Sequence, residues 1–451
     1  MDKNNALSQY IDLYEQNARE VDAHSAPALN SLRGAALNAL KGARLPDCRT
    51  EGYEKTSIED MFAPDYGVNV SRVHIPVDVA ESFRCDVPNL SILTGFVVND
   101  AFVPSRGLDS RLPEGVEFMS LARAAREMPE VVEKYLGRLA GPGKGTPEAL
   151  NALLCQDGVF IRVAAGTKPE KALQLVQIFS APIPLAAFRR MLVVVEDGAE
   201  LKLLVCDHTP DRDRAYLCSE VVEVYVGAGA RFELCGLEES SALTSRHSML
   251  HMSLGRDSET IVNSTTLTCG TTRNEFEIDL REPGASVMLS GMAIGNDSMH
   301  IDNNSSIIHS APHGHSDQLF KYVMDGESEG AFEGSIFVSH DAPFTQAYQS
   351  NRNLLASPTA RMHCKPQLII YNDEVKCSHG ATTGQLSEDA LFYMRQRGIP
   401  LKEARTMLMQ AFMADVIDTV RIPGLNERQR HLVERRFSGT LGNCAGCRSE
   451  K

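Results

Sequence analysis

The feature that most constrains the fold of this 451-residue chain is a loose repeat near its middle. A glycine or a charged turn precedes a small residue at Ala199, Ala230, Ser258 and Ala285, with intervals of 31, 28 and 27 residues. Short β-rich runs lie between these positions. Repeats of this length are typical of solenoids, in which each unit covers the apolar face of the next. The pattern therefore predicts a β-helix, and the alternative is a β-sandwich with irregular strand spacing.

The period of the apolar residues divides the chain into three parts. Residues 1–155 show mainly helical periodicity. Residues 156–380 lose that periodicity and consist of short β-rich runs between turns, so we assign them to the β-helix core. Residues 381–451 are helical again and are a candidate region for partner docking. We expect a mainly β protein whose core is flanked by α-helical N- and C-terminal regions.

Several helices can be predicted together with their ends. Ser387 is a good helix N-cap because a serine hydroxyl accepts a hydrogen bond from a free backbone N–H of the first turn. Pro400 suits the first turn of the helix that follows. The predicted helices cover residues 6–21, 26–40, 120–136, a short stretch closing at 154, 387–398, 400–420 and 426–437.

The charge balance and the aromatic content exclude several classes of protein. The chain has 45 Lys and Arg against 59 Asp and Glu, a net charge of −14, which disfavours nucleic acid and anionic membranes as partners. No run of about 18 apolar residues occurs, and the N-terminus lacks the apolar segment of a signal peptide. We therefore expect a cytoplasmic protein without membrane spans. Secreted β-helix enzymes that act on polysaccharides use stacking aromatics, and this chain has no Trp, so such an enzyme is a poor alternative.

Three motifs resemble catalytic or metal sites, but another interpretation is favoured for each. Gly326-Glu-Ser328-Glu-Gly330 matches the nucleophile elbow, but the residues after it predict a strand and not the helix that this motif needs. The loop at 141–147 contains Gly-Lys but lacks the other residues of a phosphate-binding loop, so we expect no ATP hydrolysis by this chain. The histidine-rich stretch 309–315 is better explained as a polar loop than as a metal site.

The most informative pair for chemistry is Cys377 and His379. Side chains two residues apart in an extended segment face the same way, and a thiolate with an imidazole is half of a site for a soft metal. The remaining ligands must come from elsewhere in this chain or from a second chain. The adjacent His363 and Cys364 point to opposite faces by the same alternation, so at most one of them can join.

The C-terminal tail carries a second pair of thiols, Cys444 and Cys447, in a C-x-x-C spacing. This spacing is compatible with a metal site or a redox pair. No second C-x-x-C exists to complete a four-cysteine site, so an incidental tail is the favoured interpretation. The roles of these residues, and of His363 and Cys364, stay open.

A long ungapped motif around the Cys377–His379 pair resembles the SufB/SufD family of iron–sulfur cluster assembly proteins. It consists of Pro366-Gln-Leu, Val375-Lys-Cys-Ser-His-Gly-Ala-Thr-Thr-Gly384 and Leu391-Phe-Tyr-Met-Arg-Gln-Arg-Gly398. The Cys-Ser-His-Gly-Ala-Thr form resembles the SufD branch more than the SufB branch. The clear resemblance covers residues 310–420, and a weaker one lies at 51–57.

The resemblance implies a fold, partners and a site. The family fold is a right-handed parallel β-helix between helical regions. SufD proteins associate with SufB and with the ABC-type ATPase SufC, which docks on C-terminal helices, here 387–420. His379 matches a histidine at the SufB interface, and Cys377 is its neighbour in the motif, so both are candidate transient ligands of iron or a nascent cluster. A reduced flavin is associated with such complexes, although no flavin site is visible here.

The resemblance implies a scaffold and not an enzyme, and two alternatives remain. The chain is either a scaffold subunit that helps to acquire iron and form nascent clusters with SufB and SufC, or an interaction subunit of the same system in which no metal touches His379. The second alternative includes a homodimer and an assembly with SufC alone.

Overall fold

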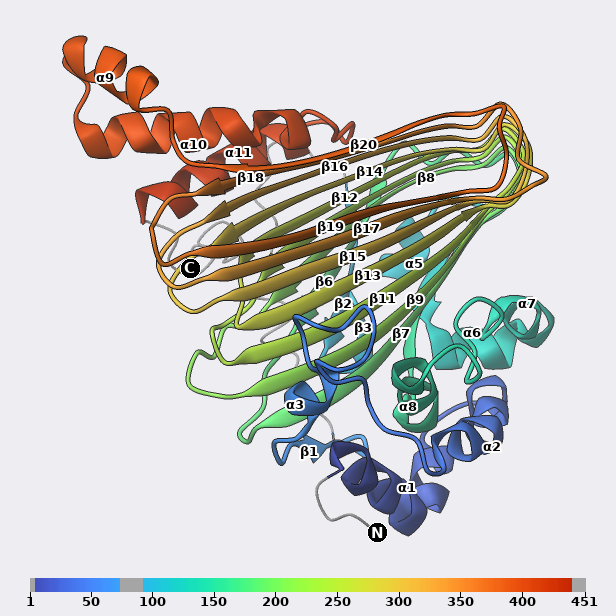
Figure 1. Ribbon diagram of the computed structural model, residues 1–451. Helices are drawn as coiled ribbons and strands as arrows, with labels where there is room; N and C mark the ends of the chain where they lie inside the picture. Colours follow the sequence, from blue (N-terminus) through green and yellow to red (C-terminus); the bar gives the residue numbers. More distant parts are fainter. Residues whose placement is uncertain (1–4, 74–91, 440–451) are drawn as a thin grey trace.

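The computed structural model describes residues 5–73 and 92–439, and its core is a parallel β-helix (Figure 1). Within the described residues, two ten-stranded sheets face each other, one built mainly from odd-numbered strands, with β4, and the other mainly from even-numbered strands, with β3. From β5 and β6 onward, neighbouring strands in each sheet are two apart in the chain, because each coil contributes one strand to each sheet. The predicted β-helix with flanking helices is therefore confirmed, and the sandwich alternative is wrong.

The strands of the solenoid become regular from β11 onward, where each coil adds two strands of about ten residues. The strand bounds are β1 Gly67–Val68, β2 Ile92–Val98, β3 Ala101–Pro104, β4 Val116–Ser120, β5 Gly158–Val163, β6 Ala172–Ile178, β7 Leu185–Val195, β8 Glu200–His208, β9 Tyr216–Val226, β10 Arg231–Glu239, β11 Thr244–Leu254, β12 Glu259–Thr268, β13 Thr271–Leu280, β14 Ser286–Gly295, β15 His300–His309, β16 His315–Met324, β17 Glu329–Val338, β18 Gln346–Leu355, β19 Arg361–Ile370 and β20 Lys376–Gly384.

The helices lie before and after this series of strands, apart from the short ones between β3 and β5. Their bounds are α1 Ala6–Ala23, α2 Pro27–Leu40, α3 Ile58–Phe62, α5 Leu108–Arg111, α6 Leu121–Glu127, α7 Pro129–Tyr135, α8 Thr146–Leu154, α9 Glu388–Gln396, α10 Leu401–Ile417 and α11 Leu425–Ser438. The range 1–155 also supplies β2, β3 and β4, which extend the two sheets.

One helix prediction is wrong. The expected helix over 120–136 is two helices, α6 and α7, separated at Met128. Pro129 lacks a backbone N–H and opens α7 at its first turn, where that N–H is not needed. By contrast, Ser387 caps α9 as predicted, with its hydroxyl accepting a hydrogen bond from the N–H of Ala390.

The repeat seen in the sequence marks one corner of every coil. At this corner a residue with positive φ donates its N–H to a carbonyl of the next coil, for example Gly198 to Ala228 at 2.8 Å and Gly229 to Arg256 at 2.7 Å. The small residues Ala199 and Ala230 follow directly and are fully buried. A corner that must turn this sharply favours residues without a large Cβ substituent. The corner series consists of three glycines, Gly198, Gly229 and Gly284, and of three residues that adopt the positive φ despite a side chain, Asp257, His313 and Phe344.

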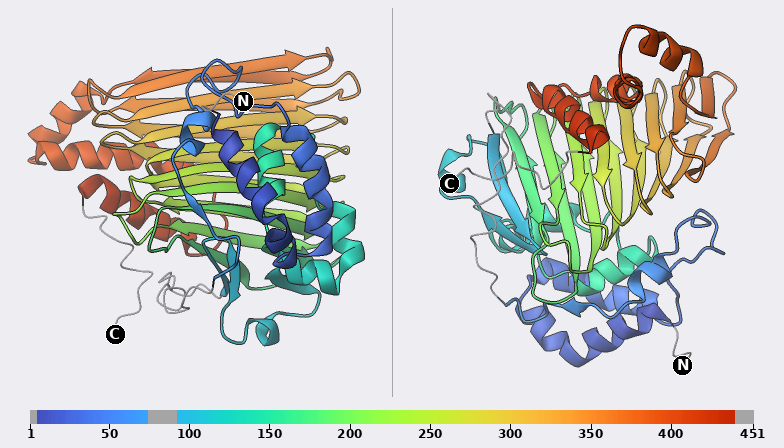
Figure 2. Two further views of the ribbon diagram at one scale, coloured as in Figure 1. Left: turned by 90° about the horizontal axis from the view of Figure 1, so that it is seen from below. Right: turned by 90° about the vertical axis from the view of Figure 1, so that its left-hand side faces the viewer.

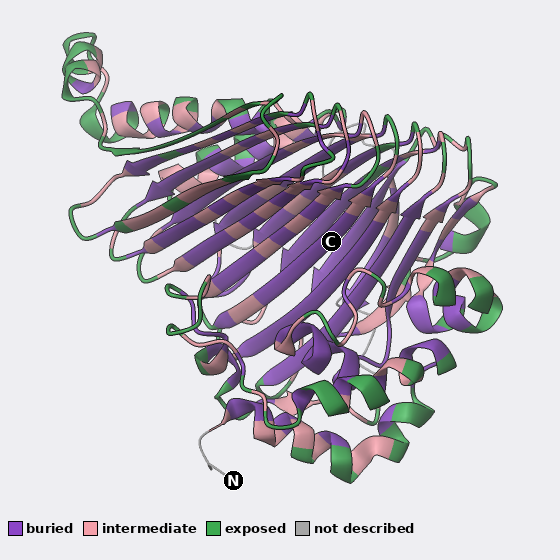
Figure 3. Ribbon diagram, turned by 45° about the vertical axis from the view of Figure 1, so that its right-hand side comes forward, coloured by how far each residue is buried: buried purple, intermediate pink, exposed green. Residues whose placement is uncertain are grey.

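The interior of the solenoid is filled by alternate side chains from both sheets. Val193, Leu203, Val224, Ile278 and Phe320 are among the buried residues that meet there. Figure 3 shows the middle strands as largely buried and the outward sides of the helices as exposed. Removal of this apolar surface from water is the main stabilising contribution.

The N-terminal helices cover the outer face of the odd-numbered sheet (Figure 2). Two polar contacts join this N-terminal region to the sheet: Thr56 donates its hydroxyl to Asp302 of β15 at 2.6 Å, and Glu223 of β9 accepts from the N–H of Gly137 at 2.9 Å. Within the region, Arg33 of α2 donates to the carbonyl of Cys155, at the end of α8, at 2.9 Å.

The C-terminal helices α10 and α11 cover part of the even-numbered sheet (Figure 2). Lys321 of β16 binds Asp415 of α10 at 2.6 Å, and Asn263 of β12 donates to the carbonyl of Val416 at 3.0 Å. Helix α9 extends away from the solenoid, and Leu391 is its buried residue (Figure 1). In the described part of the chain, no helix is long and apolar enough to cross a membrane.

Candidate interface site at the open end of the solenoid

The last coil, formed by β19 and β20, ends both sheets. In the strand order each of them has one neighbour, β17 and β18 respectively, so no further described strand pairs with their outer edges. The side chains of these two strands are half-buried or exposed, whereas the preceding strands contain many buried side chains. An edge with free backbone N–H and C=O groups is able to pair with another chain.

Cys377 lies on the inward face of this last coil. Its register partner in β18 is Ala347, which is fully buried, and paired residues of neighbouring parallel strands point the same way. The half-buried Cys377 packs against a small apolar cluster that includes Ile336 and Val338. Burial raises the pKa of its thiol, an effect that its contact with the backbone of Ala347 reduces.

His379 lies on the same inward face, two residues further along β20. Its register partner is the buried Gln349. His379 itself is exposed, because the described chain places no further coil above it. The two residues that the sequence singles out therefore share one face at the uncovered end of the interior, as their spacing predicts.

The side chains of His363 and Cys364 point to opposite faces of β19. His363 points outward and forms an ion pair with Glu329 at 2.9 Å. Cys364 points inward, and its sulfur lies 4.0 Å from the hydroxyl of Thr383 in β20. Thr383 is four residues beyond His379, so Cys364 lies roughly 13 Å from His379 along the strand direction. Neither of them joins Cys377 and His379.

Among residues 5–73 and 92–439, no three His, Cys, Asp or Glu side chains lie close enough to hold a metal ion. Cys377 and His379 are therefore a two-donor half-site within the described chain. Two ligands do not close a tetrahedral site. Cys444 and Cys447 lie outside the described residues.

The other motifs examined in the sequence do not form catalytic sites. Ser328 is buried in a turn, and its hydroxyl donates to the carbonyl of Asp325 at 2.7 Å before a strand begins. His309 is buried and forms a hydrogen bond with the hydroxyl of Ser316. The ring of His313 stacks on that of Phe344, with the ring centroids 5.0 Å apart. These histidines do not converge.

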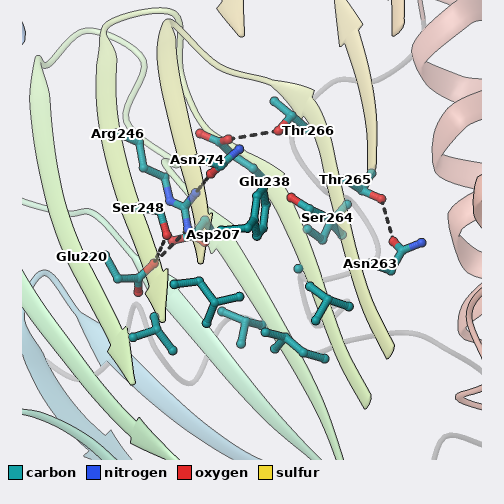
Figure 4. Close-up of a pocket in the computed structure, with 18 of the residues that line it drawn as sticks. Asp207, Glu220, Glu238, Arg246, Ser248, Asn263, Ser264, Thr265, Thr266 and Asn274 are labelled. Carbon is teal, nitrogen blue, oxygen red and sulfur yellow. Dashed lines mark hydrogen bonds and ion pairs between the residues drawn. The ribbon is translucent and has the colours of Figure 1, made fainter. Parts of the chain in front are cut away.

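A buried charge network lies inside the solenoid (Figure 4). Arg246 contacts Glu220 at 2.8 Å and Asp207 at 3.4 Å beside an internal cavity of about 70 Å³. Burial raises the pKa of Asp207, whereas the nearby arginines outweigh burial at Glu220 and lower its pKa. Single charged residues in β-rich runs give no sign that they face inward, so no sequence pattern identifies this network.

The fold and the site define a class of protein, a parallel β-helix with metal-type donors at an uncovered end. The description "SUF system FeS cluster assembly, SufBD core domain" matches residues 179–412, and "SufBD protein N-terminal region" matches residues 4–175. The chain therefore belongs to the SufBD family of iron–sulfur cluster assembly proteins.

Relatives from bacteria and a plant agree with this membership. The chain is 29% identical to the iron–sulfur cluster assembly SufBD family protein slr0076 of Synechocystis sp., over 95% of this chain and 96% of that protein. It is 30% identical to the chloroplastic protein ABCI7 of Arabidopsis thaliana, over 73% and 70%. It is 27% identical to the iron–sulfur cluster assembly protein SufD of Escherichia coli, over 66% and 72%.

Proposed function

We propose that this chain is the SufD-like scaffold subunit of an assembly with a SufB-like chain and a SufC-like ATPase, and that it works in the cytoplasm. The observation that carries the proposal is the half-site at the uncovered end of the solenoid. Cys377 and His379 lie on one inward face, and the described chain supplies no third donor. A site with this geometry is completed by ligands from another chain.

The SufB-like chain is proposed to pair with the last coil. Strands β19 and β20 offer free backbone edges, and a partner strand there adds main-chain hydrogen bonds and brings its own side chains next to His379. Iron or a nascent cluster is then held transiently between the two chains. A ligand set shared by two chains suits a cluster that must leave again, because separation of the chains opens it.

The ATPase is proposed to dock on the C-terminal helices. Helix α9 exposes 64% of Phe392 and 57% of Tyr393 while burying only Leu391 among its residues. Large exposed aromatic residues on a projecting helix are typical of a binding surface. Helix α10 is bonded to the solenoid through Lys321 and Asn263, so a movement of the ATPase reaches the strands through α10.

In this proposal the chain is not itself an enzyme, because ATP hydrolysis belongs to the separate subunit. The alternative subunit that never contacts metal, whether as a homodimer or with the ATPase alone, shares the same docking surfaces and differs only at Cys377 and His379. A flavin of the complex has no site assigned to it on this chain.

The experiment that separates these possibilities is the iron content of the anaerobically purified complex, compared with that of the isolated chain. We expect iron in the complex, little in the isolated chain, and a loss of iron in the complex that carries His379→Ala. Equal iron in the wild-type and His379→Ala complexes would favour the interaction subunit.

A further inference from the structure

A column of polar side chains leads from the solenoid interior to His379. The register places Gln318 of β16 beside Gln349 of β18, and Gln349 beside His379 of β20. All three face inward, because paired residues of parallel strands point the same way. Gln318 and Gln349 are buried, whereas His379 is exposed at the end.

Gln349 is held across the interior by the opposite sheet. Its Nε2 donates to the carbonyl of Gly334 in β17 at 3.3 Å. A Cβ atom on Gly334 would lie 2.0 Å from that Nε2, so a larger residue at position 334 would displace the amide from this position. The side chain therefore has a defined position directly below His379.

The other end of the same amide has an unmet hydrogen bond. Gln349 is only 4% exposed, and its Oε1 has no hydrogen-bond partner within the described residues. A buried amide oxygen without a donor is unfavourable, so a donor is expected close by. The adjacent coils offer two candidates, the ring of His379 and the Nε2 of Gln318, which is also without a partner among the described residues.

We propose that Gln349 is a positioning residue whose Oε1 accepts a hydrogen bond from a ring N–H of His379. The inference rests on the proposed function of His379 as a ligand. Histidines that bind metals usually donate their second ring N–H to a fixed acceptor, which sets the tautomer and the ring orientation. Gln349 supplies that acceptor from below and leaves the other ring nitrogen directed toward the open end and the partner chain.

The test measures the ring nitrogens of His379 in the isolated, metal-free chain by ¹⁵N NMR at a pH where the ring is neutral. The His379 signals are assigned by their loss in His379→Ala. We expect one dominant tautomer in the wild type. In Gln349→Met, which keeps a similar volume without an acceptor, we expect the averaged signals of a free ring.

Gln318→Met is the matched control, because it removes a buried amide one coil further from His379. We expect it to leave the His379 signals unchanged. A Gln349→Met chain with unchanged His379 signals and an unchanged melting temperature overturns the proposal. So does a Gln318→Met chain that changes the His379 signals as much as Gln349→Met does, since the amide of Gln349 then belongs to a Gln318–Gln349 pair.

A second readout uses iron(II) as the probe in the complex with the SufB-like chain. Loss of a supporting hydrogen bond of this kind weakens metal binding by about 10- to 100-fold, and we expect Gln349→Met to fall in that range. If the wild-type complex binds no iron while the NMR result holds, the proposed function fails and the positioning role stands. If iron binds equally in both complexes, the positioning role fails.

Discussion

At the scale of single residues, two histidines that are sixteen positions apart in the chain face different surroundings. His379 faces the uncovered interior, and His363 faces outward on Glu329. Both are parts of edge strands, and both are accessible enough that substitution should not disturb the fold. They form a matched pair of positions for a functional test.

We predict that His379→Ala abolishes cluster maturation in cells that depend on this chain, because the shared site loses its imidazole. Activity of an iron–sulfur enzyme measures the result, and the amount of folded chain is followed in parallel. His363→Ala, which removes an outward ion pair, is expected to keep full maturation. Normal maturation with His379→Ala contradicts the assigned role.

A second residue-scale prediction concerns His251 of β11, which lies 3.4 Å from Glu148 of α8 and 3.8 Å from Glu277. Burial lowers the pKa of His251, but the two carboxylates outweigh burial and raise it to about 9. Because the pKa is higher in the folded state, protonated His251 stabilises the fold, and this contribution is complete at a pH below the pKa of about 6.5 in the unfolded chain. This contribution is lost as the pH rises through 9.

The free energy of unfolding should therefore fall between pH 6.5 and 9 by an amount on the order of 2–3 kcal/mol from this group. The measurement is urea unfolding of wild type and His251→Gln across that range. The difference between the two proteins should shrink with rising pH. A pH-independent difference contradicts the ion-pair explanation.

The sequence predicts the positions of Cys377 and His379 because alternation in a strand is a local rule. It does not predict that Cys364 lies opposite Thr383, because that contact depends on how the two sheets face each other across the last coil. The sequence also does not predict the contact of Arg246 with Glu220 in the interior, because that contact joins strands from different coils.

At the scale of elements, the corner of each coil explains why the repeat is visible in the sequence. Gly198 and Gly229 adopt positive φ, and the small residue after each is buried where the next coil stacks. The predicted single helix over 120–136 fails for an equally local reason, the proline at position 129. Strand β12 extends well beyond its apolar pair Ile261 and Val262, because polar residues such as Asn263 and Thr265 also face covered surfaces.

Stacking at the coils predicts an asymmetric response to two glycine substitutions. A Cβ on Gly255 would lie 2.9 Å from the backbone of the preceding coil at Gly227, which cannot move aside. A Cβ on Gly236 would meet its nearest neighbour, the carbonyl of Asn263, at 3.8 Å. We expect Gly255→Ala to lower the free energy of unfolding by about 1–3 kcal/mol.

Gly236→Ala serves as the control and is expected to cost less than Gly255→Ala. Chemical denaturation of both variants measures the difference. Equal stability of the two variants would show that the coils are packed less tightly at this corner than the structure indicates.

At the scale of the whole molecule, helices cover both sheets but leave the last coil and α9 uncovered (Figure 2). The fold class and the helical ends follow from the sequence, because periodicity is a property of long segments. The uncovered end does not, since it depends on where the helices pack on the sheets.

The exposed aromatic pair of α9 gives a prediction at this scale. Phe392→Ser with Tyr393→Ser should abolish binding of the SufC-like ATPase and leave the melting temperature within about 1 °C, because neither side chain packs against the solenoid. Calorimetric titration with the ATPase measures binding. Exposed Leu401→Ser, at the start of α10, is a comparison that tests how far the surface extends. Undiminished binding by the double variant contradicts docking at α9.

The most direct test of the account is anaerobic size-exclusion chromatography with light scattering on a mixture of this chain, a SufB-like chain and a SufC-like ATPase from the same host. We expect a stable species that contains all three chains. A chain that elutes alone in the presence of both partners would contradict the account.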